Sequence, residues 1–103
     1  TKLYYGAHSG DHTIYPDCRP EFVAAMNKVL SFCDWHPIEL VVPYLHGNKE
    51  TILRRGYELG VDYAYTWTCY NGREKACGKC GSCDERLGAF KAIGQDDPLE
   101  YES

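Results

Sequence analysis

The sequence predicts an α/β domain with a small appended lobe, and two observations support this prediction. Two short apolar stretches that resemble strands alternate with two helix-like stretches over residues 2–59, an order typical of α/β domains. Four of the six cysteines then fall within residues 69–83, which indicates a separate small element held together by its sulfurs. A chain of 103 residues is long enough for one small core and too short for two independent ones.

The first half of the chain predicts a strand, a polar loop and a helix. Residues 2–7 are expected to form a short buried strand, and residues 8–19 a polar loop of the kind that binds ligands in open α/β sheets. Pro20 suits the first position of a helix, where its missing N–H costs nothing. Apolar residues recur at helical spacing over residues 20–33, and Cys33 is expected to be a small buried member of this apolar face.

A second strand and helix are predicted next. Residues 38–43 have the apolar run of a strand. Asn48 is expected to cap a helix over residues 49–59, and Gly60 is expected to end that helix in the left-handed conformation.

The last third predicts an aromatic extended segment and one more helix. Residues 61–67 are expected to be extended and to lead into the first clustered cysteine. A helix is predicted over residues 82–93, with Gly94 ending it. The acidic tail, residues 95–103, is expected to lie on the surface.

Charge and hydropathy exclude several classes of protein. Eleven Lys and Arg against fifteen Asp and Glu leave a net charge of -4, the wrong sign for a protein that binds nucleic acid by neutralising phosphates. The sequence has no apolar run long enough for a membrane span and no signal peptide at its start. We therefore expect a cytoplasmic chain rather than a membrane protein or secreted precursor.

The cysteine cluster has the spacing Cys69-x7-Cys77-x2-Cys80-x2-Cys83. A disulfide framework is the alternative, but the absence of an export signal and the crowding of four cysteines favour a metal. Four thiolates suit a closed, structural tetrahedral zinc site. An iron–sulfur cluster is the rival metal centre, because ferredoxins also use Cys-x2-Cys-x2-Cys.

Three segments carry a family resemblance. They are Tyr-Pro-Asp-Cys-Arg-Pro-Glu-Phe at residues 15–22, Thr-Trp-Thr-Cys-Tyr-Asn-Gly at 66–72 and Cys-Gly-Lys-Cys-Gly-Ser-Cys at 77–83. In this order they resemble the 7-cyano-7-deazaguanine synthase family (QueC), and residues 59–63 and 97–101 fit the same family. The resemblance covers essentially the whole chain but only about the carboxyl-terminal half of a family member.

The resemblance implies a fold, a reaction and ligands. It implies part of a Rossmann-like PP-loop ATPase fold in residues 1–68 and a four-cysteine zinc-binding lobe in residues 69–103. The implied reaction converts 7-carboxy-7-deazaguanine and ammonia to 7-cyano-7-deazaguanine with ATP and Mg²⁺, through an adenylate, an amide and a second activation. The zinc ligands of the family match Cys69, Cys77, Cys80 and Cys83.

One departure from the family is the absence of its ATP-binding loop, Ser-Gly-Gly-x-Asp-Ser. Nothing else in the sequence clearly supplies the converging N–H donors that a phosphate needs. We therefore expect a fragment or one half of a split enzyme, inactive until an amino-terminal half is added. A homodimer is a further expectation, because a half-domain would expose a sheet edge.

The loop before the first helix holds the candidate catalytic residues. Arg19 can clamp a carboxylate or phosphate, and Asp17 can accept hydrogen bonds from a purine-like amine; an Asp–Arg ion pair that only holds the loop is the alternative. Cys18 is a candidate nucleophile. Asp11 and His12 are candidates for substrate binding in the same loop.

Two functions of other classes stay open from the sequence. The chain could be a non-catalytic zinc-binding module for a protein partner, although such a module has no need of residues 15–22. An iron–sulfur redox protein is the other alternative, and it predicts visible absorption.

Overall fold

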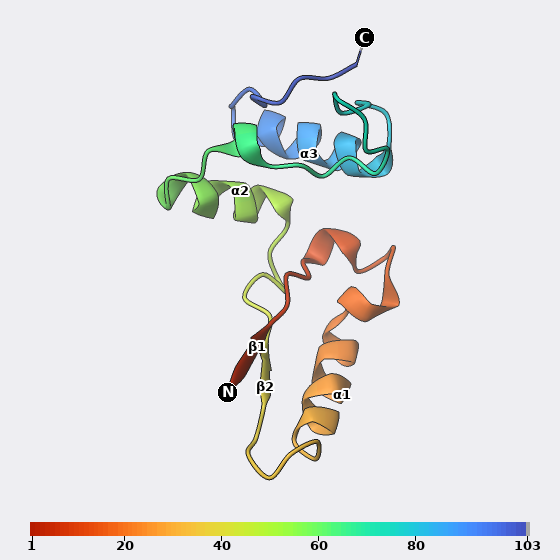
Figure 1. The fold of residues 1–103 in the computed structure, drawn as a ribbon, viewed down its shortest axis with the longest axis vertical. Helices are drawn as coiled ribbons and strands as arrows, with labels where there is room; N and C mark the ends of the chain where they lie inside the picture. Colours follow the sequence, from red (N-terminus) through yellow and green to blue (C-terminus); the bar gives the residue numbers. More distant parts are fainter. Residues whose placement is uncertain (103) are drawn as a thin grey trace. The chain divides into compact units, whose positions relative to one another are not determined.

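The computed structural model describes residues 1–102, and within them the predicted α/β order is present (Figure 1). The strands and helices are β1 (Lys2–Tyr4), α1 (Pro20–Leu30), β2 (Glu39–Val41), α2 (Lys49–Glu58) and α3 (Gly81–Ala92), with short 3₁₀ turns η1 (Ser9–Asp11), η2 (Pro16–Cys18) and η3 (Tyr63–Tyr65). None of the helices in the described part of the chain has the length and hydropathy needed to cross a bilayer.

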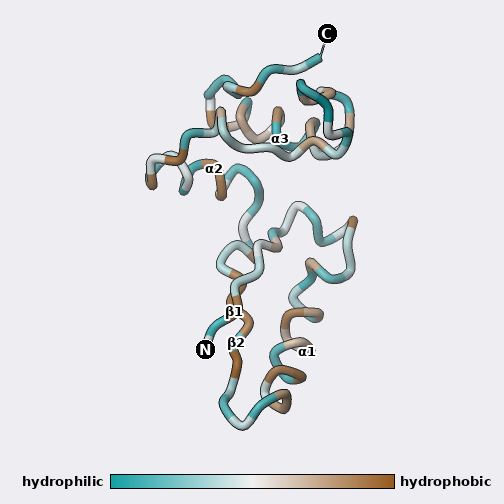
Figure 2. The backbone as a smooth tube through the Cα atoms, in the orientation of Figure 1, coloured by the Kyte–Doolittle hydropathy of each residue, from teal (hydrophilic) through white to brown (hydrophobic). Residues whose placement is uncertain are grey.

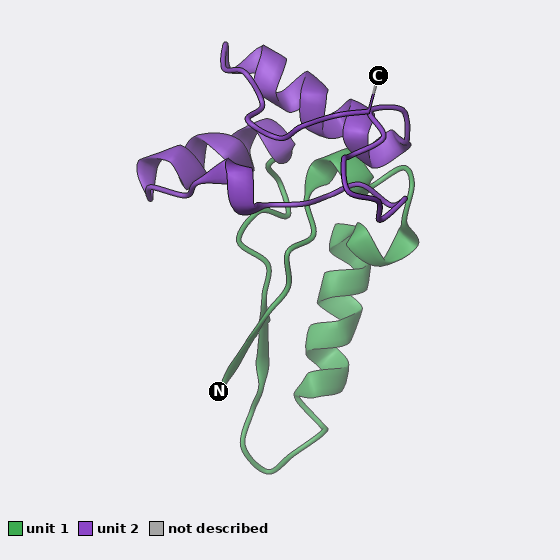
Figure 3. Ribbon diagram, turned by 45° about the horizontal axis from the view of Figure 1, so that its top comes forward, with its two compact units in different colours: residues 1–48 green, residues 49–103 purple. Residues whose placement is uncertain are grey.

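The chain divides into two compact units, residues 1–48 and residues from Lys49 onward (Figure 3). The boundary expected from the sequence lies between residues 68 and 69, whereas the two compact units are divided between residues 48 and 49. The reason is that α2 packs on α3, with Leu53 of α2 and Phe90 of α3 in one buried cluster. Helix α2 therefore belongs with the cysteine-bearing part.

The first unit, residues 1–48, is a parallel pair of strands with α1 packed on β2. Leu3 pairs with Leu40 in the register of the two strands. The other edge of β2 is closed by a side chain, because the Asn27 amide accepts from Leu40 N–H at 2.8 Å and donates to its carbonyl at 3.2 Å. Helix α1 thus satisfies the backbone of β2 where no strand pairs with it.

Two burial predictions for this unit are wrong. Strand β1 was expected to be buried, yet Leu3 is 53% exposed and Tyr4 is 66% exposed. Hydrophobic residues nevertheless mark both strands and recur along α1 (Figure 2). Cys33 was expected on the buried face of α1, but α1 ends at Leu30 and Cys33 is exposed in the turn that follows.

The second unit has its own core. Leu53, Tyr63, Ala89 and Phe90 form a buried cluster, and the Tyr63 and Phe90 rings meet edge to face with centroids 5.5 Å apart. Tyr63 Oη donates to the Leu53 carbonyl at 3.0 Å. This approach needs Gly56, since a Cβ there would lie 1.7 Å from Tyr63 Oη.

The predicted ends of α2 and α3 are confirmed by Gly60 and Gly94, which have φ values of 78° and 72°. Residues 61–67, however, are not uniformly extended. Tyr63–Tyr65 form a 3₁₀ turn, because the Asp62 carboxylate accepts from Ala64 N–H at 3.0 Å and begins the turn.

The acidic tail also departs from its prediction. Instead of lying on the surface throughout, it contributes the Asp97 side chain to a buried ion pair. Leu99 and Tyr101 pack against the buried cysteines. The charged side chains that suggested a surface tail belong to its other residues, such as Glu100, which is exposed.

Candidate metal centre

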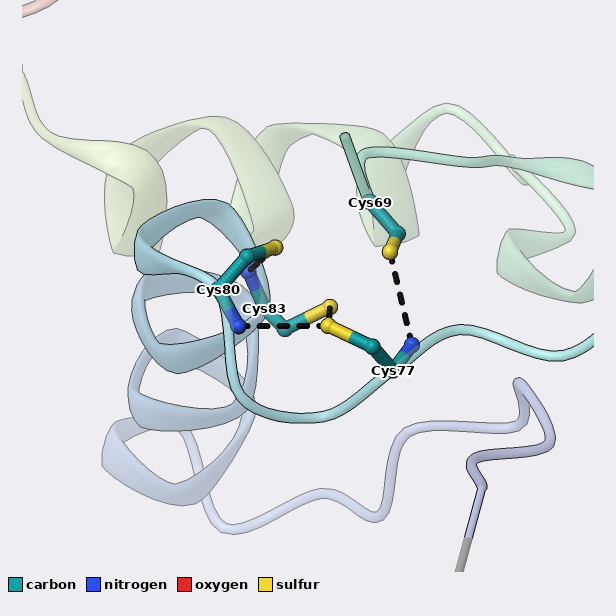
Figure 4. A group of neighbouring side chains, drawn as sticks. All are labelled: Cys69, Cys77, Cys80 and Cys83. Atoms are coloured by element: carbon teal, nitrogen blue, oxygen red, sulfur yellow. Dashed lines mark hydrogen bonds between the residues drawn. The ribbon is translucent and has the colours of Figure 1, made fainter. Parts of the chain in front are cut away.

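The structure brings the four clustered cysteines together at the start of α3 (Figure 4). Cys80 is the N-cap of α3, Cys83 lies in its first turn, and Cys77 lies in the loop just before. Cys69 approaches from the segment that follows η3. All four Sγ atoms lie within 4.8 Å of one another.

Backbone N–H groups point at the sulfurs of this centre. The N–H groups of Lys79 and Cys80 lie 3.3 and 3.2 Å from Cys77 Sγ. Gly78 adopts a φ of 72° in this turn, a conformation that favours glycine and lets both N–H groups face one sulfur. The Cys77 N–H donates in the same way to Cys69 Sγ at 3.4 Å.

The backbone N–H donors lower the pKa of the thiols, whereas the burial of the site raises it. Hydrogen bonds from the backbone of Lys79 and Cys80 lower the pKa of Cys77 to about 6. Backbone hydrogen bonds also lower the pKa of Cys80. Burial raises the pKa of Cys83 to about 12. The peptide backbone therefore favours the thiolate forms of Cys77 and Cys80, whereas burial favours the neutral thiol of Cys83.

The geometry fits a tetrahedral metal ion. A metal–sulfur bond of about 2.3 Å in a tetrahedral site places the sulfurs about 3.8 Å apart, and Cys77 Sγ lies 4.0 Å from Cys83 Sγ. That separation is about twice a disulfide bond, and all six cysteines are free. The cluster is compatible with a metal site, and no disulfide joins its cysteines in this structure.

The structure places Asp17 and Cys18 beside Tyr5, a residue that the sequence analysis did not select. Tyr5 Oη donates to the Asp17 carbonyl at 3.1 Å and lies 3.8 Å from Cys18 Sγ. Burial, with the neighbouring Cys18 thiol, raises the pKa of Tyr5 to about 12. Cys18 is buried, whereas Asp17 is exposed. The position of Tyr5 just after β1, at the carboxyl end of a strand, was the signal that could have identified it.

The other predicted residues of this loop lie within the same unit. Arg19 Nε donates to the His12 carbonyl, which closes the loop between them. Asp11 pairs with the buried His8, Oδ2 to Nε2, at 3.2 Å. His12 Nε2 is buried and makes no hydrogen bond within residues 1–102. The alternative considered from the sequence, an Asp17–Arg19 ion pair that only holds the loop, is not among the contacts of the described residues.

A unit with two parallel strands and a helix, and a second unit with four clustered cysteines that are compatible with a metal site, together define the class of α/β protein. Comparison with known protein families identifies the family within this class. Residues 1–94 match the model of the queuosine biosynthesis protein QueC, and the chain belongs to this family.

Individual relatives agree with this assignment. The chain is 62% identical over 102 residues to a 7-cyano-7-deazaguanine synthase of Marinomonas sp. (strain MWYL1), covering 99% of the chain and 47% of the relative. It is 61% identical to the synthase of Alteromonas mediterranea, with 98% and 46% covered, and 60% identical to that of Caldicellulosiruptor bescii, again with 98% and 46% covered. The chain therefore spans about half the length of the relatives it matches.

Proposed function

We propose that the chain is the metal-bearing half of an enzyme that makes 7-cyano-7-deazaguanine from 7-carboxy-7-deazaguanine and ammonia at the expense of ATP, in the cytoplasm. The observation that carries the proposal is the joint presence of the four-thiol centre and about 60% identity, along the chain, to synthases with this product in their name.

The proposed reaction has two activations. The substrate carboxylate attacks the α-phosphate of ATP and releases pyrophosphate, and ammonia then displaces AMP from the adenylate to give an amide. A second ATP activates the amide oxygen in the same way. Loss of that oxygen with AMP, and of the two amide protons, leaves the nitrile. This half of the enzyme lacks the family's phosphate loop, so ATP and Mg²⁺ are bound by the other half.

We propose zinc as the metal, with Cys69, Cys77, Cys80 and Cys83 as its ligands. Zinc favours four thiolates in a tetrahedron, and the sulfur separations support such a site. Four protein ligands leave no position for substrate, so the zinc is structural. It joins the segment around Cys69 to the start of α3 and stabilises the fold of a unit with a small core.

The ligand loop is proposed to hold the substrate. The Arg19 side chain is exposed and presents the remaining N–H groups of its guanidinium to a carboxylate or phosphate. Asp17 would accept from the amino group of the deazapurine, and the buried His12 Nε2 has a free hydrogen-bonding position for the same ring. Asp11 orients the loop through His8. Cys18 lies beside them, with Tyr5 against its sulfur. A nucleophilic role for Cys18 would add one step to the scheme above, in which its thiolate displaces AMP from the adenylate to give a thioester and ammonia then displaces the thiolate to give the amide.

Strand β1 supports the proposal that another half completes the sheet. An isolated two-stranded sheet is marginally stable, and Leu3 and Tyr4 are largely exposed. A missing amino-terminal half, or a second copy of the chain, would cover these residues. The greater length of the relatives favours the amino-terminal half.

The test is complementation. The zinc-loaded chain is mixed with the separately expressed amino-terminal half of a relative, and nitrile formation is followed with ATP, ammonia and the carboxylate. We expect no product from the chain alone and product from the mixture. Arg19→Ala should lower the rate at least tenfold, whereas Lys28→Ala, an exposed charge on α1, should not. A mixture that binds tightly and stays inactive would contradict the proposal.

A non-catalytic zinc module is the second candidate, because the four cysteines and a hydrophobic core all lie in residues 49–102. This candidate predicts that the residues of the ligand loop are dispensable. If Arg19→Ala and Asp17→Asn leave every activity of the complemented enzyme unchanged, the module is favoured.

A further inference from the structure

The further inference concerns Asp97–Glu102, here called the strap, and its relation to the four-cysteine centre. The strap follows α3, and residues within it contact the loop before Cys77. It contains no metal ligand among the clustered cysteines. Its contacts nevertheless reach each of the segments that carry the four thiols.

One end of the strap is fixed by Arg86, which lies one turn beyond Cys83 on α3 and is 3% exposed. Arg86 donates to both Asp97 oxygens, from Nε at 2.7 Å and from Nη2 at 2.9 Å. This bidentate pair ties the strap to the helix that carries Cys80 and Cys83.

The same guanidinium also holds the segment that leads to Cys69. Its Nη1 donates to the Thr66 carbonyl at 3.2 Å and to Thr66 Oγ1 at 3.0 Å, and Nη2 donates to the Tyr63 carbonyl at 3.1 Å. With the two bonds to Asp97, all five N–H donors of Arg86 have an acceptor. The Arg86 guanidinium therefore links three segments: α3, the strap and the segment that leads to Cys69.

The other end of the strap lies against the turn that contains Cys77. The Ala76 N–H donates to the Glu100 carbonyl at 3.2 Å, and the Glu102 N–H donates to the Ala76 carbonyl at 2.8 Å. Tyr101, between them, lies against Gly78, where a Cβ would be 3.4 Å from the ring. The strap thus holds Cys77 on both sides through its neighbours in the chain.

Tyr101 connects the two ends of the strap. Its hydroxyl donates to Asp97 Oδ2, and the Leu99 N–H donates to Asp97 Oδ1 at 2.9 Å. The side chains of Leu99 and Tyr101 pack against the buried cluster of Cys69, Ala76, Cys77 and Cys83. This packing adds apolar surface beside the buried cysteines, and such a hydrophobic shell limits the access of water and chelators to a metal site.

We propose that the strap is a latch on the metal centre, with Tyr101 as the positioning residue that couples Asp97 and Arg86 to the turn of Cys77. The latch controls how fast the metal leaves, because release requires the turn of Cys77 to move away from the start of α3, which carries Cys80 and Cys83. This inference rests on the proposed metal site.

The test measures metal release from the full zinc-loaded chain with a colorimetric chelator, 4-(2-pyridylazo)resorcinol, well below the unfolding temperature. Tyr101→Phe keeps the ring on Gly78 and removes only the hydroxyl. We expect release about tenfold faster, the effect of losing one hydrogen bond to a charged group. Tyr65→Phe is the matched control, since Tyr65 is 89% exposed in the same unit, and it should release metal within twofold of the wild-type rate.

A spectroscopic readout separates positioning from general stability. With Co²⁺ as the bound ion, Tyr101→Phe should alter the visible d–d bands, and Tyr65→Phe should leave them unchanged. A lower unfolding temperature for Tyr101→Phe, with unchanged bands and an unchanged release rate, would overturn the latch. A wild-type chain that binds neither zinc nor Co²⁺ would overturn both the metal site and the latch.

Hydrogen exchange on the wild-type chain keeps the proposal testable if Tyr101→Phe fails to fold. The Ala76 and Glu102 amides bridge the strap and the Cys77 turn. In the zinc-loaded chain both amides should exchange at least tenfold more slowly than exposed, unbonded amides, because the strap stays closed while the metal is bound. Exchange of the two amides at the rate of exposed amides in the zinc-loaded chain would overturn the latch.

Discussion

The two compact units contrast in how they use their apolar residues. In residues 49–102, Phe90 and Cys83 are each 1% exposed, and the buried charge of Arg86 has a matching carboxylate. In residues 1–48, Leu3 and Tyr4 of a strand are more than half exposed. The comparison teaches that the second unit pairs its buried charge and fills its core with its own residues, whereas β1 has most of its apolar surface still to bury.

The largest expected effect is that removal of the proposed metal unfolds the second unit and leaves the first unit folded. Removal of the metal by EDTA at neutral pH should unfold residues 49–102, because structural zinc contributes on the order of 10 kcal/mol to small zinc-dependent folds. The helices α2 and α3 should lose hydrogen-exchange protection, while α1 keeps its own. Cys83→Ser should act like EDTA, whereas Cys33→Ser, at an exposed thiol, should retain one metal per chain. Loss of metal in the Cys33 variant would refute this account.

The next largest effect is at the buried ion pair of the second unit. Asp97→Asn leaves the Arg86 charge without its carboxylate and should cost about 3–5 kcal/mol in the free energy of unfolding. Asp96→Asn is the control, because Asp96 is the exposed neighbour and should change that energy by less than about 0.5 kcal/mol. Urea titrations of the two variants measure the difference. Equal midpoints would show that the pair does not stabilise the unit.

The Asp97 pair also has a pH signature. Burial raises the pKa of Asp97, but the hydrogen bonds from Arg86 and Tyr101 outweigh it and lower the pKa below 3.8. A lowered folded-state pKa means that Asp97 stabilises the fold fully above pH 3.8 and loses this contribution as the pH falls through the folded-state value. The difference in unfolding free energy between wild type and Asp97→Asn should therefore be constant near neutral pH and shrink in acid. A difference that grows in acid would contradict the sign.

A smaller effect is expected in the first unit. Asn27→Ala removes both hydrogen bonds to the backbone of Leu40 and should cost about 1–3 kcal/mol. Hydrogen exchange of the Leu40 backbone amide should become faster, while the exchange rate of the Phe90 amide in the second unit stays unchanged. Lys28→Ala, an exposed position on the same helix, serves as the control. Faster exchange at Phe90 in the Asn27 variant would mean that the units are not independent in stability.

The smallest effect on the chain alone is expected from Leu3→Asn. The side chain is already 53% exposed, so stability should change by less than about 1 kcal/mol. Complementation by an amino-terminal half should weaken markedly, because the proposed contact would meet a polar side chain. A variant that loses stability alone but complements normally would place the role of Leu3 inside this unit.

The sequence predicted the regular parts of this fold because their signals are local. The apolar spacing of α1 and the glycines after α2 and α3 act within a few residues of where they occur. The gathering of the cysteines was also predictable, since a short spacing limits how far apart the thiols can lie. These features depend little on the rest of the chain.

The parts that were not predicted depend on distant partners. The side chain of Tyr63 is held by a hydrogen bond to Leu53 on α2, and the tail is held by Arg86. The local composition of an acidic tail is the same whether its aspartates face water or a buried guanidinium. The sequence around Asp97 therefore predicted a surface position. The role of Tyr5 was hidden for the same reason: Cys18 lies 13 residues away.

Elemental analysis of the purified chain, together with its visible absorption spectrum, tests the central claim most directly. The account predicts one zinc per chain, no visible absorption, and protection of the four clustered thiols from a thiol reagent that is lost when the zinc is removed. Iron with visible absorption, or six freely reacting thiols without metal, would contradict a zinc centre built by the second unit alone.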